Sequence, residues 1–214
     1  QNIPIRTDEG KEIRKAFVAP EGMKLLAVDY SQIELRVVAH VSGDKVMTET
    51  FKRDEDIHMA TAAKVYGVAE SKVTSAMRRN AKAVNFGIPM GMTYKGLSAE
   101  LRKNGVDADE DDAQCWLDET MALYAQVPVY QARMADEARA RGYIRCLSGR
   151  IRYIGGIRSP HRHIVEEARR FAFATPIQEG AQWIAKLAES RMWDMLLSYW
   201  KDKRWIEPLV QIHD

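Results

Sequence analysis

The sequence predicts an α+β protein with an antiparallel sheet built from both ends of the chain and a mainly helical insertion between them. A short apolar run at residues 24–29 has the length of a buried strand, and residues 206–212 alternate enough to form another. Helix-type patterns ended by glycine or proline occupy most of residues 56–198. Strands at the two ends and helices in the middle favour one subdomain made from both ends and a second, helical one.

The individual elements follow from local signals. Ser31 fits a helix N-cap with Glu34 as its capping-box partner, and that helix runs toward His40 before Gly43. Ser148-Gly149 predicts a hairpin. Helices are expected over residues 56–66, 72–86, 93–104, 109–124, 129–141 and 164–198, with the hairpin at 143–157 and an interruption of the last helix near Pro176.

The composition sets limits on the kind of protein. A chain of 214 residues with 46% hydrophobic residues supports one domain or two small ones with an ordinary core. Cys115 and Cys146 lie far apart and form no CxxC pair, which favours two free thiols in a reducing compartment. There is no run of 18 apolar residues and no signal peptide at the start. We expect a soluble, cytoplasmic protein without a membrane partner.

The charges are unevenly distributed, although the net charge is only +2. Residues 133–170 contain ten arginines and four acidic residues, whereas residues 107–119 contain seven acidic residues and no basic ones. One interpretation is a face for polyanions beside a solvated acidic face. The other is that both stretches are solvated helix surfaces.

Two aspartates occupy equivalent places in the predicted sheet. Asp29 follows the first predicted strand and Asp214 follows the last. If the strands are neighbours, both carboxylates reach the same cleft, and Mg²⁺ prefers such hard oxygen ligands together with substrate phosphates. Taken alone, a strand-end aspartate is more often a turn or cap residue.

A basic helix is predicted between the two aspartates. Arg78, Lys82 and Phe86 follow each other at intervals of four and therefore share one helix face. Cations pair with phosphate oxygens, and an aromatic ring packs against a sugar or base. Without further context, a basic pair at this spacing is usually a solvated surface.

Together these motifs resemble the family A DNA polymerases over the whole of residues 1–214. The resemblance rests on three stretches in order: DYSQIELR at 29–36, RRNAK leading into NFG at 78–87, and HD at 213–214. It implies a palm made from residues 1–50 and 161–214, with fingers at residues 51–160. The fingers are the helical insertion, and the palm carries the sheet.

The resemblance also implies residue roles. Asp29, Asp214 and the main-chain carbonyl of Tyr30 would bind two Mg²⁺ ions, with the two aspartates as the catalytic residues. Glu34 would exclude a 2′-hydroxyl from the nucleotide pocket. The full implied nucleotide-binding set is Tyr30, Gln32, Ile33, Glu34, His58, Arg78, Lys82, Phe86 and Met90. The implied DNA-binding set is Arg170, Gln178 and His213, with Arg145, Arg150, Arg152 and Arg158 either on the DNA backbone or simply at the surface.

Several positions depart from the family pattern. Pro89 and Met90 stand where the family has an aliphatic residue and a tyrosine, and proline should end or kink the helix after Ile88. Ala174 and Glu179 replace an asparagine and a glycine, so part of a DNA minor-groove contact is lost or rebuilt. The family's acidic residue after Asp214 is missing as well, so we expect a partial gene product. The departures at Met90, Ala174 and Glu179 suggest a divergent source such as a phage.

The implied function is template-directed addition of dNTPs to the 3′-hydroxyl of a primer by a monomeric enzyme bound to primer–template DNA. We expect the 214-residue chain alone to be inactive. Two alternatives are a non-catalytic DNA-binding palm and fingers, and a relative of the single-subunit RNA polymerases. Glu34 argues against the RNA polymerase alternative, because that family lacks an acidic side chain at this position.

Overall fold

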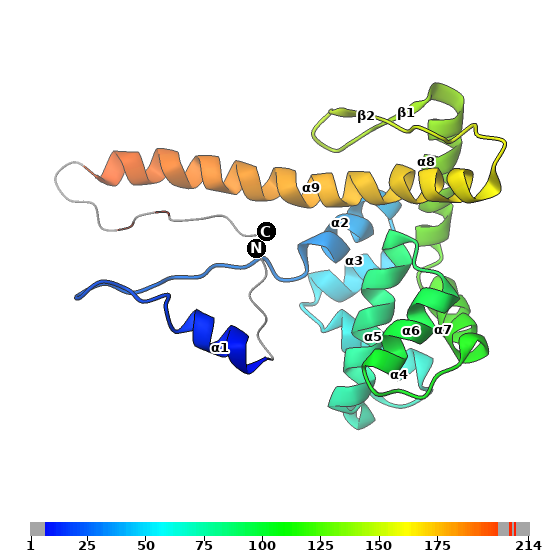
Figure 1. Cartoon of the computed structure of the whole chain (residues 1–214), viewed down its shortest axis with the longest axis horizontal. Helices are drawn as coiled ribbons and strands as arrows, with labels where there is room; N and C mark the ends of the chain where they lie inside the picture. Colours follow the sequence, from blue (N-terminus) through cyan, green and yellow to red (C-terminus); the bar gives the residue numbers. More distant parts are fainter. Residues whose placement is uncertain (1–6, 201–205, 207, 209–214) are drawn as a thin grey trace.

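A computed structural model describes residues 7–200 together with Ile206 and Pro208. His213, Asp214 and nearly all of the predicted strand at 206–212 therefore lie outside the described residues. The helices and strands appear in Figure 1 in the following order: α1 Asp8–Arg14, α2 Ile33–Ser42, α3 Lys45–Lys52, α4 Ile57–Val65, a 3-10 helix Glu70–Lys72, α5 Ser75–Gly87, a 3-10 helix Ile88–Met90, α6 Tyr94–Lys103, α7 Glu110–Leu123, α8 Gln126–Arg141, β1 Tyr143–Arg145, β2 Ile151–Tyr153 and α9 Arg162–Tyr199.

The described residues are mostly helical with one small antiparallel sheet, which is consistent with the predicted α+β class. The sheet consists of β1 and β2, which pair with Ile144 opposite Arg152. The two strands form the predicted hairpin, with Ser148-Gly149 in the turn between them. The expected strand at residues 24–29 is not formed. That segment pairs with no described strand, and Leu26 and Val28 are each 79% exposed. An apolar run becomes a strand only where a neighbour accepts its hydrogen bonds, and the described part of the chain supplies none.

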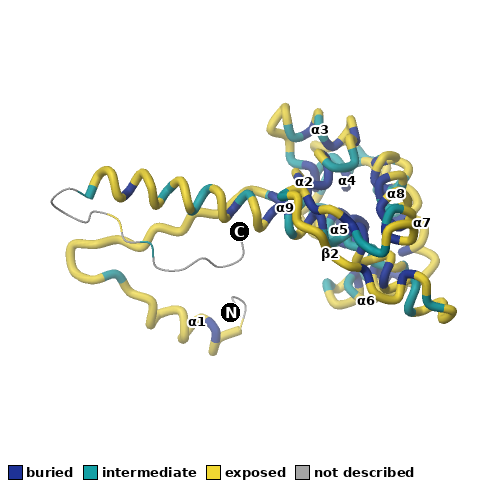
Figure 2. Tube along the Cα trace, turned by 90° about the horizontal axis from the view of Figure 1, so that it is seen from above, coloured by how far each residue is buried: buried dark blue, intermediate teal, exposed yellow. Residues whose placement is uncertain are grey.

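The molecule has two visibly different regions (Figure 2). The first, here called the helical body, comprises residues 33–185 and contains nearly all of the buried positions. The second, here called the extension, comprises residues 7–30 and 186–200, and most of its side chains are exposed. Figure 1 shows the N-terminal part of the extension running beneath the second half of α9.

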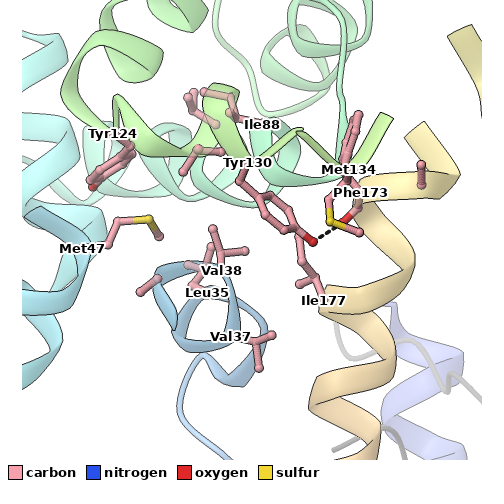
Figure 3. Close-up of a cluster of buried hydrophobic side chains, with 14 of the residues drawn as sticks. Leu35, Val37, Val38, Met47, Ile88, Tyr124, Tyr130, Met134, Phe173 and Ile177 are labelled. Carbon is pink, nitrogen blue, oxygen red and sulfur yellow. Dashed lines mark hydrogen bonds between the residues drawn. The ribbon is translucent and has the colours of Figure 1, made fainter. Parts of the chain in front are cut away.

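The core of the helical body lies where α2, α8 and α9 meet, joined by Met47 of α3 and Ile88 of the second 3-10 helix (Figure 3). Leu35 and Val38 of α2 point into it and are completely or almost completely buried. Tyr130 of α8 enters from the opposite side, and its hydroxyl donates a hydrogen bond of 3.0 Å to the carbonyl of Phe173 in α9. Burial of this apolar cluster fixes the relative positions of the helices that carry the candidate site.

Helix α9 is continuous over its 38 residues, so the predicted interruption near Pro176 is wrong. Proline normally breaks a helix because it removes an amide donor and crowds the preceding turn. Here Ala172, Phe173, Pro176 and Ile177 are all buried, and α9 packs against α2 and α8. Tertiary packing therefore keeps the backbone helical through the proline.

The start of α2 also differs from the expectation. Ser31 does not cap the helix: the N-cap is Gln32, in the left-handed region at φ 57°, without a side-chain capping bond. Nor does a Ser31–Glu34 capping box form; instead the Ser31 carbonyl accepts a bond of 2.9 Å from Nε of Arg36. The guanidinium of Arg36 lies 4.7 Å from the centre of the Phe51 ring, on α3. Arg36 thereby links the entry of α2 to its neighbour.

Candidate active site

Helix α5 carries the predicted basic face, and its two ends are set by local chemistry. The Thr74 hydroxyl caps the start by accepting a bond from the amide of Met77. The helix ends at Gly87, and Pro89 follows within a 3-10 turn, as predicted for a proline at this position. The carbonyl of Ile88 accepts a 3.0 Å bond from the amide of Gly91 within this turn and a 2.8 Å bond from Nε2 of Gln131.

Arg78, in the first half of α5, is held by Asp56. Its Nε lies 2.7 Å from Oδ2 of that carboxylate. The other carboxylate oxygen accepts bonds from the amides of His58 and Met59, so Asp56 is also the N-cap of α4. Burial by itself would raise the pKa of Asp56, but these hydrogen bonds and the Arg78 charge bring it below the ordinary value. Asp56 therefore joins α4 to α5 and neutralises one of the two predicted phosphate-binding cations.

Lys82 follows one turn later and is exposed. Its Nζ lies 5.7 Å from the centre of the Phe86 ring, which is half-buried. No carboxylate of the described residues forms an ion pair with Lys82. The face of α5 thus presents one neutralised cation, one cation without an ion pair in the described part of the chain, and then an aromatic ring.

His58 of α4 lies behind this face. Its ring centre is 5.8 Å from that of Phe86, but the residue is only 1% exposed. Burial lowers the pKa of His58 to about 4; the nearby Asp56 opposes this change, and the charges of Arg78 and Lys82 favour it. The imidazole is therefore neutral at physiological pH. The structure brings His58 to the predicted cluster but covers it from solvent.

An open cavity of about 670 Å³ lies at the C-terminal end of α5. Phe86 and Met90 line it from the predicted nucleotide-binding set, and Arg170 lines it from the predicted DNA-binding set. The whole lining is Ala83, Phe86, Gly87, Met90, Gly91, Met92, Thr93, Gly96, Glu100 and Arg170. The fold therefore brings together residues that are 84 positions apart in the sequence, because α9 packs against the turn that follows α5.

Gly91 permits this close approach. Its φ of +75° is a conformation that other residues rarely adopt, and a Cβ there would lie 2.7 Å from Cζ of Phe173 and 2.8 Å from Cγ of Arg170. Any side chain at this position would push Arg170 away from the cavity.

The segment that contains Asp29 enters the helical body at α2. Asp29 is exposed and Tyr30 is partly exposed, whereas Ile33 is 4% exposed and belongs to the core. Glu34 is half-buried in the first turn of α2. The Oε1 atom of Gln32 is buried and has no hydrogen-bond partner among the described residues. Of the predicted nucleotide-pocket residues in this segment, Ile33 is thus directed inward.

The departures from the family pattern on α9 have visible consequences. Gln178 is exposed, while the carboxylate of Glu179 turns toward the hairpin and accepts a hydrogen bond from the hydroxyl of Ser148. Next to it, Gly180 allows Leu147 to approach, since a Cβ there would lie 2.7 Å from Cδ1 of Leu147. Glu179 therefore fixes the arginine-rich hairpin to α9.

His213 and Asp214 lie outside the described residues, so the expected meeting of Asp29 with Asp214 stays a prediction. Within the described part of the chain, no cluster of three or more His, Cys, Asp or Glu side chains is arranged to hold a metal ion. The Asp29 carboxylate and the Tyr30 carbonyl are oxygen donors of the kind that Mg²⁺ accepts. Among the described helices, none is sufficiently long and apolar to span a membrane.

Comparison with known proteins identifies the family of the chain. The model of DNA polymerase family A matches residues 1–214, and the chain therefore belongs to that family. Polymerases of this family use divalent metal ions. The resemblance expected from the three motifs is thereby confirmed.

Several bacterial relatives align with the entire chain. The identity is 42% over 214 residues to "DNA polymerase I, thermostable" of Thermus filiformis, 42% over 214 residues to DNA polymerase I of Pseudomonas aeruginosa, and 44% over 215 residues to that of Bacillus subtilis. The alignments cover 100% of this chain but 24%, 23% and 24% of those proteins, respectively. The chain thus spans about a quarter of the length of these relatives.

A solved structure is also similar: the POL domain of Pol1 from M. smegmatis in complex with DNA primer–template and dNTP. The TM-score is 0.85 and the identity 34%, with 100% of this chain and 36% of that chain covered. The fold of the described residues is therefore that of part of a polymerase domain.

Three contributors to the site were missed by the sequence reasoning. Asp56 was passed over although an aspartate at a helix start is a recognisable N-cap. Asn85 was noted only as part of a motif, and Gly91 not at all. Asp56 pairs with Arg78, Asn85 lies 3.1 Å from the ring of His58, and Gly91 leaves room for Arg170. These partners are distant in sequence, and no local pattern indicates such a pairing.

Proposed function

We propose that this chain supplies the fingers and part of the palm of a template-directed DNA polymerase that adds dNTPs to a primer 3′-hydroxyl. The observation that carries the proposal is the face of α5, where Lys82 and the Phe86 ring lie beside a cavity that Arg170 also lines. The proposed division keeps the palm at residues 1–50 and 161–214 and the fingers at 51–160. The polymerase–DNA–dNTP complex of the M. smegmatis relative supports primer–template DNA and dNTP as partners.

In this proposal Lys82 binds the triphosphate, and the Phe86 ring packs against the sugar. Arg78 is available to phosphate only in exchange with Asp56, since the two side chains are paired at 2.7 Å. Arg170 and Gln178 are exposed on α9, where they would contact the primer–template together with His213. Gln32 and Met90 complete the nucleotide pocket.

Asp29, the Tyr30 carbonyl and Asp214 are the residues we propose for metal binding. Two Mg²⁺ ions held there would activate the primer 3′-hydroxyl and neutralise charge on the triphosphate. We also propose that the parent protein is a monomer and that it works in the cytoplasm of a bacterial cell or a phage-infected host; the bacterial relatives support the bacterial setting.

The test is primer extension by a chimera in which the 214 residues replace the aligned segment of the Bacillus subtilis relative. We expect Mg²⁺-dependent incorporation, and we expect Lys82→Ala to raise the KM for dNTP about tenfold or more while the Kd for DNA changes little. Lys64→Ala, at an exposed lysine of α4, is the matched control. Equal loss of DNA affinity and dNTP use in Lys82→Ala would contradict the assignment.

A second variant tests the proposed sugar selection. Glu34→Ala in the same chimera should admit ribonucleotides, because a side chain that discriminates by steric exclusion needs no specific bond to the sugar. Incorporation of single dNTPs and rNTPs, measured side by side, should show a larger gain for rNTP than loss for dNTP. An unchanged preference would mean that Glu34 has only a structural role in α2.

A further inference from the structure

A buried polar network lies directly behind the α5 face and connects three helices. His58 and Thr61 belong to α4, Asn85 to α5, and Tyr124 follows α7; all four are buried. Nδ2 of Asn85 lies 3.1 Å from Nδ1 of His58 and 3.3 Å from the carbonyl of Ile57. The Thr61 hydroxyl lies 2.7 Å from the same carbonyl and 2.6 Å from the Tyr124 hydroxyl.

The chemistry of these groups fixes the direction of the hydrogen bonds. The Ile57 carbonyl can only accept, so the Asn85 atom beside it must be the NH₂ group and not the amide oxygen. The Thr61 hydroxyl accepts a 2.9 Å bond from Nδ2 of Asn85, and its own proton has two acceptors within reach, the Ile57 carbonyl and Oδ1 of Asn85 at 3.0 Å. Because that proton is used in either case, Tyr124 donates to Thr61. Burial raises the pKa of Tyr124 to about 12, which keeps its proton in place for this bond.

The same amide faces the imidazole. Because Asn85 presents an N–H to Nδ1 of His58, that ring nitrogen must act as the acceptor. The proton of the neutral ring is then on Nε2. Protonation of Nδ1 would place two donors against each other at 3.1 Å, which disfavours the imidazolium independently of burial.

We propose that Asn85 is a positioning residue for His58: its amide holds the imidazole as the neutral tautomer protonated on Nε2, the form that can donate a hydrogen bond to a phosphate oxygen once the side chains covering this 1% exposed residue move aside. The inference rests on the proposed function, since the phosphate is that of the nucleotide. His58 then recognises phosphate as a neutral donor, and Lys82 supplies the positive charge. The centre of the Phe86 ring lies 5.8 Å from that of the imidazole.

The ionisable surroundings favour this assignment. Asp56 and Arg78 form an ion pair in front of His58, and Lys82 adds a positive charge from α5. Tyr124, with Asp44 as its charged neighbour, faces the network from the side of α7. Asp56 is the group here that favours a charged imidazole, and the neighbouring charges of Arg78 and Lys82 oppose it.

The experiment is long-range ¹H–¹⁵N NMR of the imidazoles in the 214-residue chain, labelled with ¹⁵N-histidine and recorded from pH 5 to 8. We expect the Nε2–H tautomer for His58 over this whole range. Asn85→Asp, which has the same shape but only acceptor oxygens, should move the proton to Nδ1 and raise the midpoint of titration by about one pH unit or more. Asn104→Asp, at the C-cap of α6, is the control and should leave His58 unchanged.

Two results would overturn the role of Asn85: an Nδ1–H tautomer in the unmodified chain, or an imidazolium already present above pH 6. Both are read from the unmodified chain, so the test remains decisive even if Asn85→Asp fails to fold. Addition of Mg²⁺ and inorganic tripolyphosphate then separates this inference from the proposed function. In a uniformly ¹⁵N-labelled sample we expect the His58 and Lys82 resonances to shift together. If the tautomer is as expected but neither resonance moves, phosphate does not bind at this site. The proposed hydrogen bond from His58 to a phosphate oxygen is then refuted.

Discussion

The helical body and the extension contain similar apolar residues, but these side chains are mostly buried in the helical body and mostly exposed in the extension. Leu35 of α2 is 1% exposed, whereas Leu26, nine residues earlier, is 79% exposed. A helix satisfies its own backbone hydrogen bonds and needs only a packing partner for one face, and α2 finds α3, α8 and α9. An extended segment needs neighbours for its backbone as well as for its side chains. The difference shows that burial depends on available partners and not on hydrophobicity alone.

The largest effect should come from truncating the same residue type in the two regions. Leu35→Ala removes a fully packed side chain and should lower the free energy of unfolding by about 3 to 4 kcal/mol. Leu26→Ala should change it by less than about 0.5 kcal/mol. Urea denaturation followed by circular dichroism measures both. A similar loss in the two variants would mean that residue 26 is buried in solution.

Gly91→Ala tests the close packing of the turn after α5 against α9 inside the helical body. It combines a positive φ with contacts below 3 Å to Phe173 and Arg170, so we expect a loss of about 2 to 3 kcal/mol in the free energy of unfolding. Gly105→Ala is the control, because its φ is +84° but nothing lies within 4 Å of the added Cβ. That control should cost only about 1 kcal/mol. If the two variants are equally stable, α9 does not approach Gly91 as closely as described.

Acid should weaken the helical body through His58. In the native state the pKa of His58 is about 4, whereas the unfolded state binds the proton near the ordinary value of 6.5. Between these two pKa values the unfolded state binds a proton at His58 and the native state does not. The free energy of unfolding therefore falls as the pH drops below 6.5. From pH 7 to 5 the loss should be about 2 kcal/mol.

Denaturation midpoints of the unmodified chain and His58→Gln, measured across that range, check this expectation. The variant should lose most of the dependence on pH, while His40→Gln, at an exposed position in α2, should keep it. An identical slope in the chain and in His58→Gln would rule out His58 as the cause.

The smallest effect concerns the hairpin at the edge of the helical body. Ser148→Ala removes the hydroxyl that donates to Glu179 and should lower the free energy of unfolding by about 1 kcal/mol. Amide hydrogen exchange should become faster in residues 143–153 and remain unchanged in the middle of α9. Ser71→Ala, at an exposed position, is the control. Unaltered exchange in the hairpin would show that Leu147 alone holds it against Gly180.

The sequence was sufficient for those helices whose ends have local causes. Thr93, Asp109 and Gly142 mark boundaries of α6, α7 and α8, and each acts within one helical turn. Helices α1 and α3 were missed although Thr7 and Asp44 cap them through their side chains. Their short lengths of 7 and 8 residues give little periodicity to detect.

Other features depended on contacts between distant residues. Pro176 remains helical because its neighbours are buried, and residues 24–29 do not form a strand because no described partner lies beside them. In the candidate site, the basic helix was predicted with its end at Pro89, whereas the pairing of Arg78 with Asp56 and the burial of His58 were not. Both require knowledge of how α4 packs on α5.

The uninterrupted helix α9 has a mechanical consequence. At 1.5 Å per residue its 38 residues span about 57 Å, and the stretch from residue 185 to residue 199 accounts for about 21 Å of that length. A straight rod clamped at one end magnifies small rotations at the other: a tilt of about 10° at residue 185 displaces residue 199 by about 4 Å. The tight packing around Phe173, Pro176 and Gly180 therefore sets the position of side chains that lie several turns away and touch none of those residues.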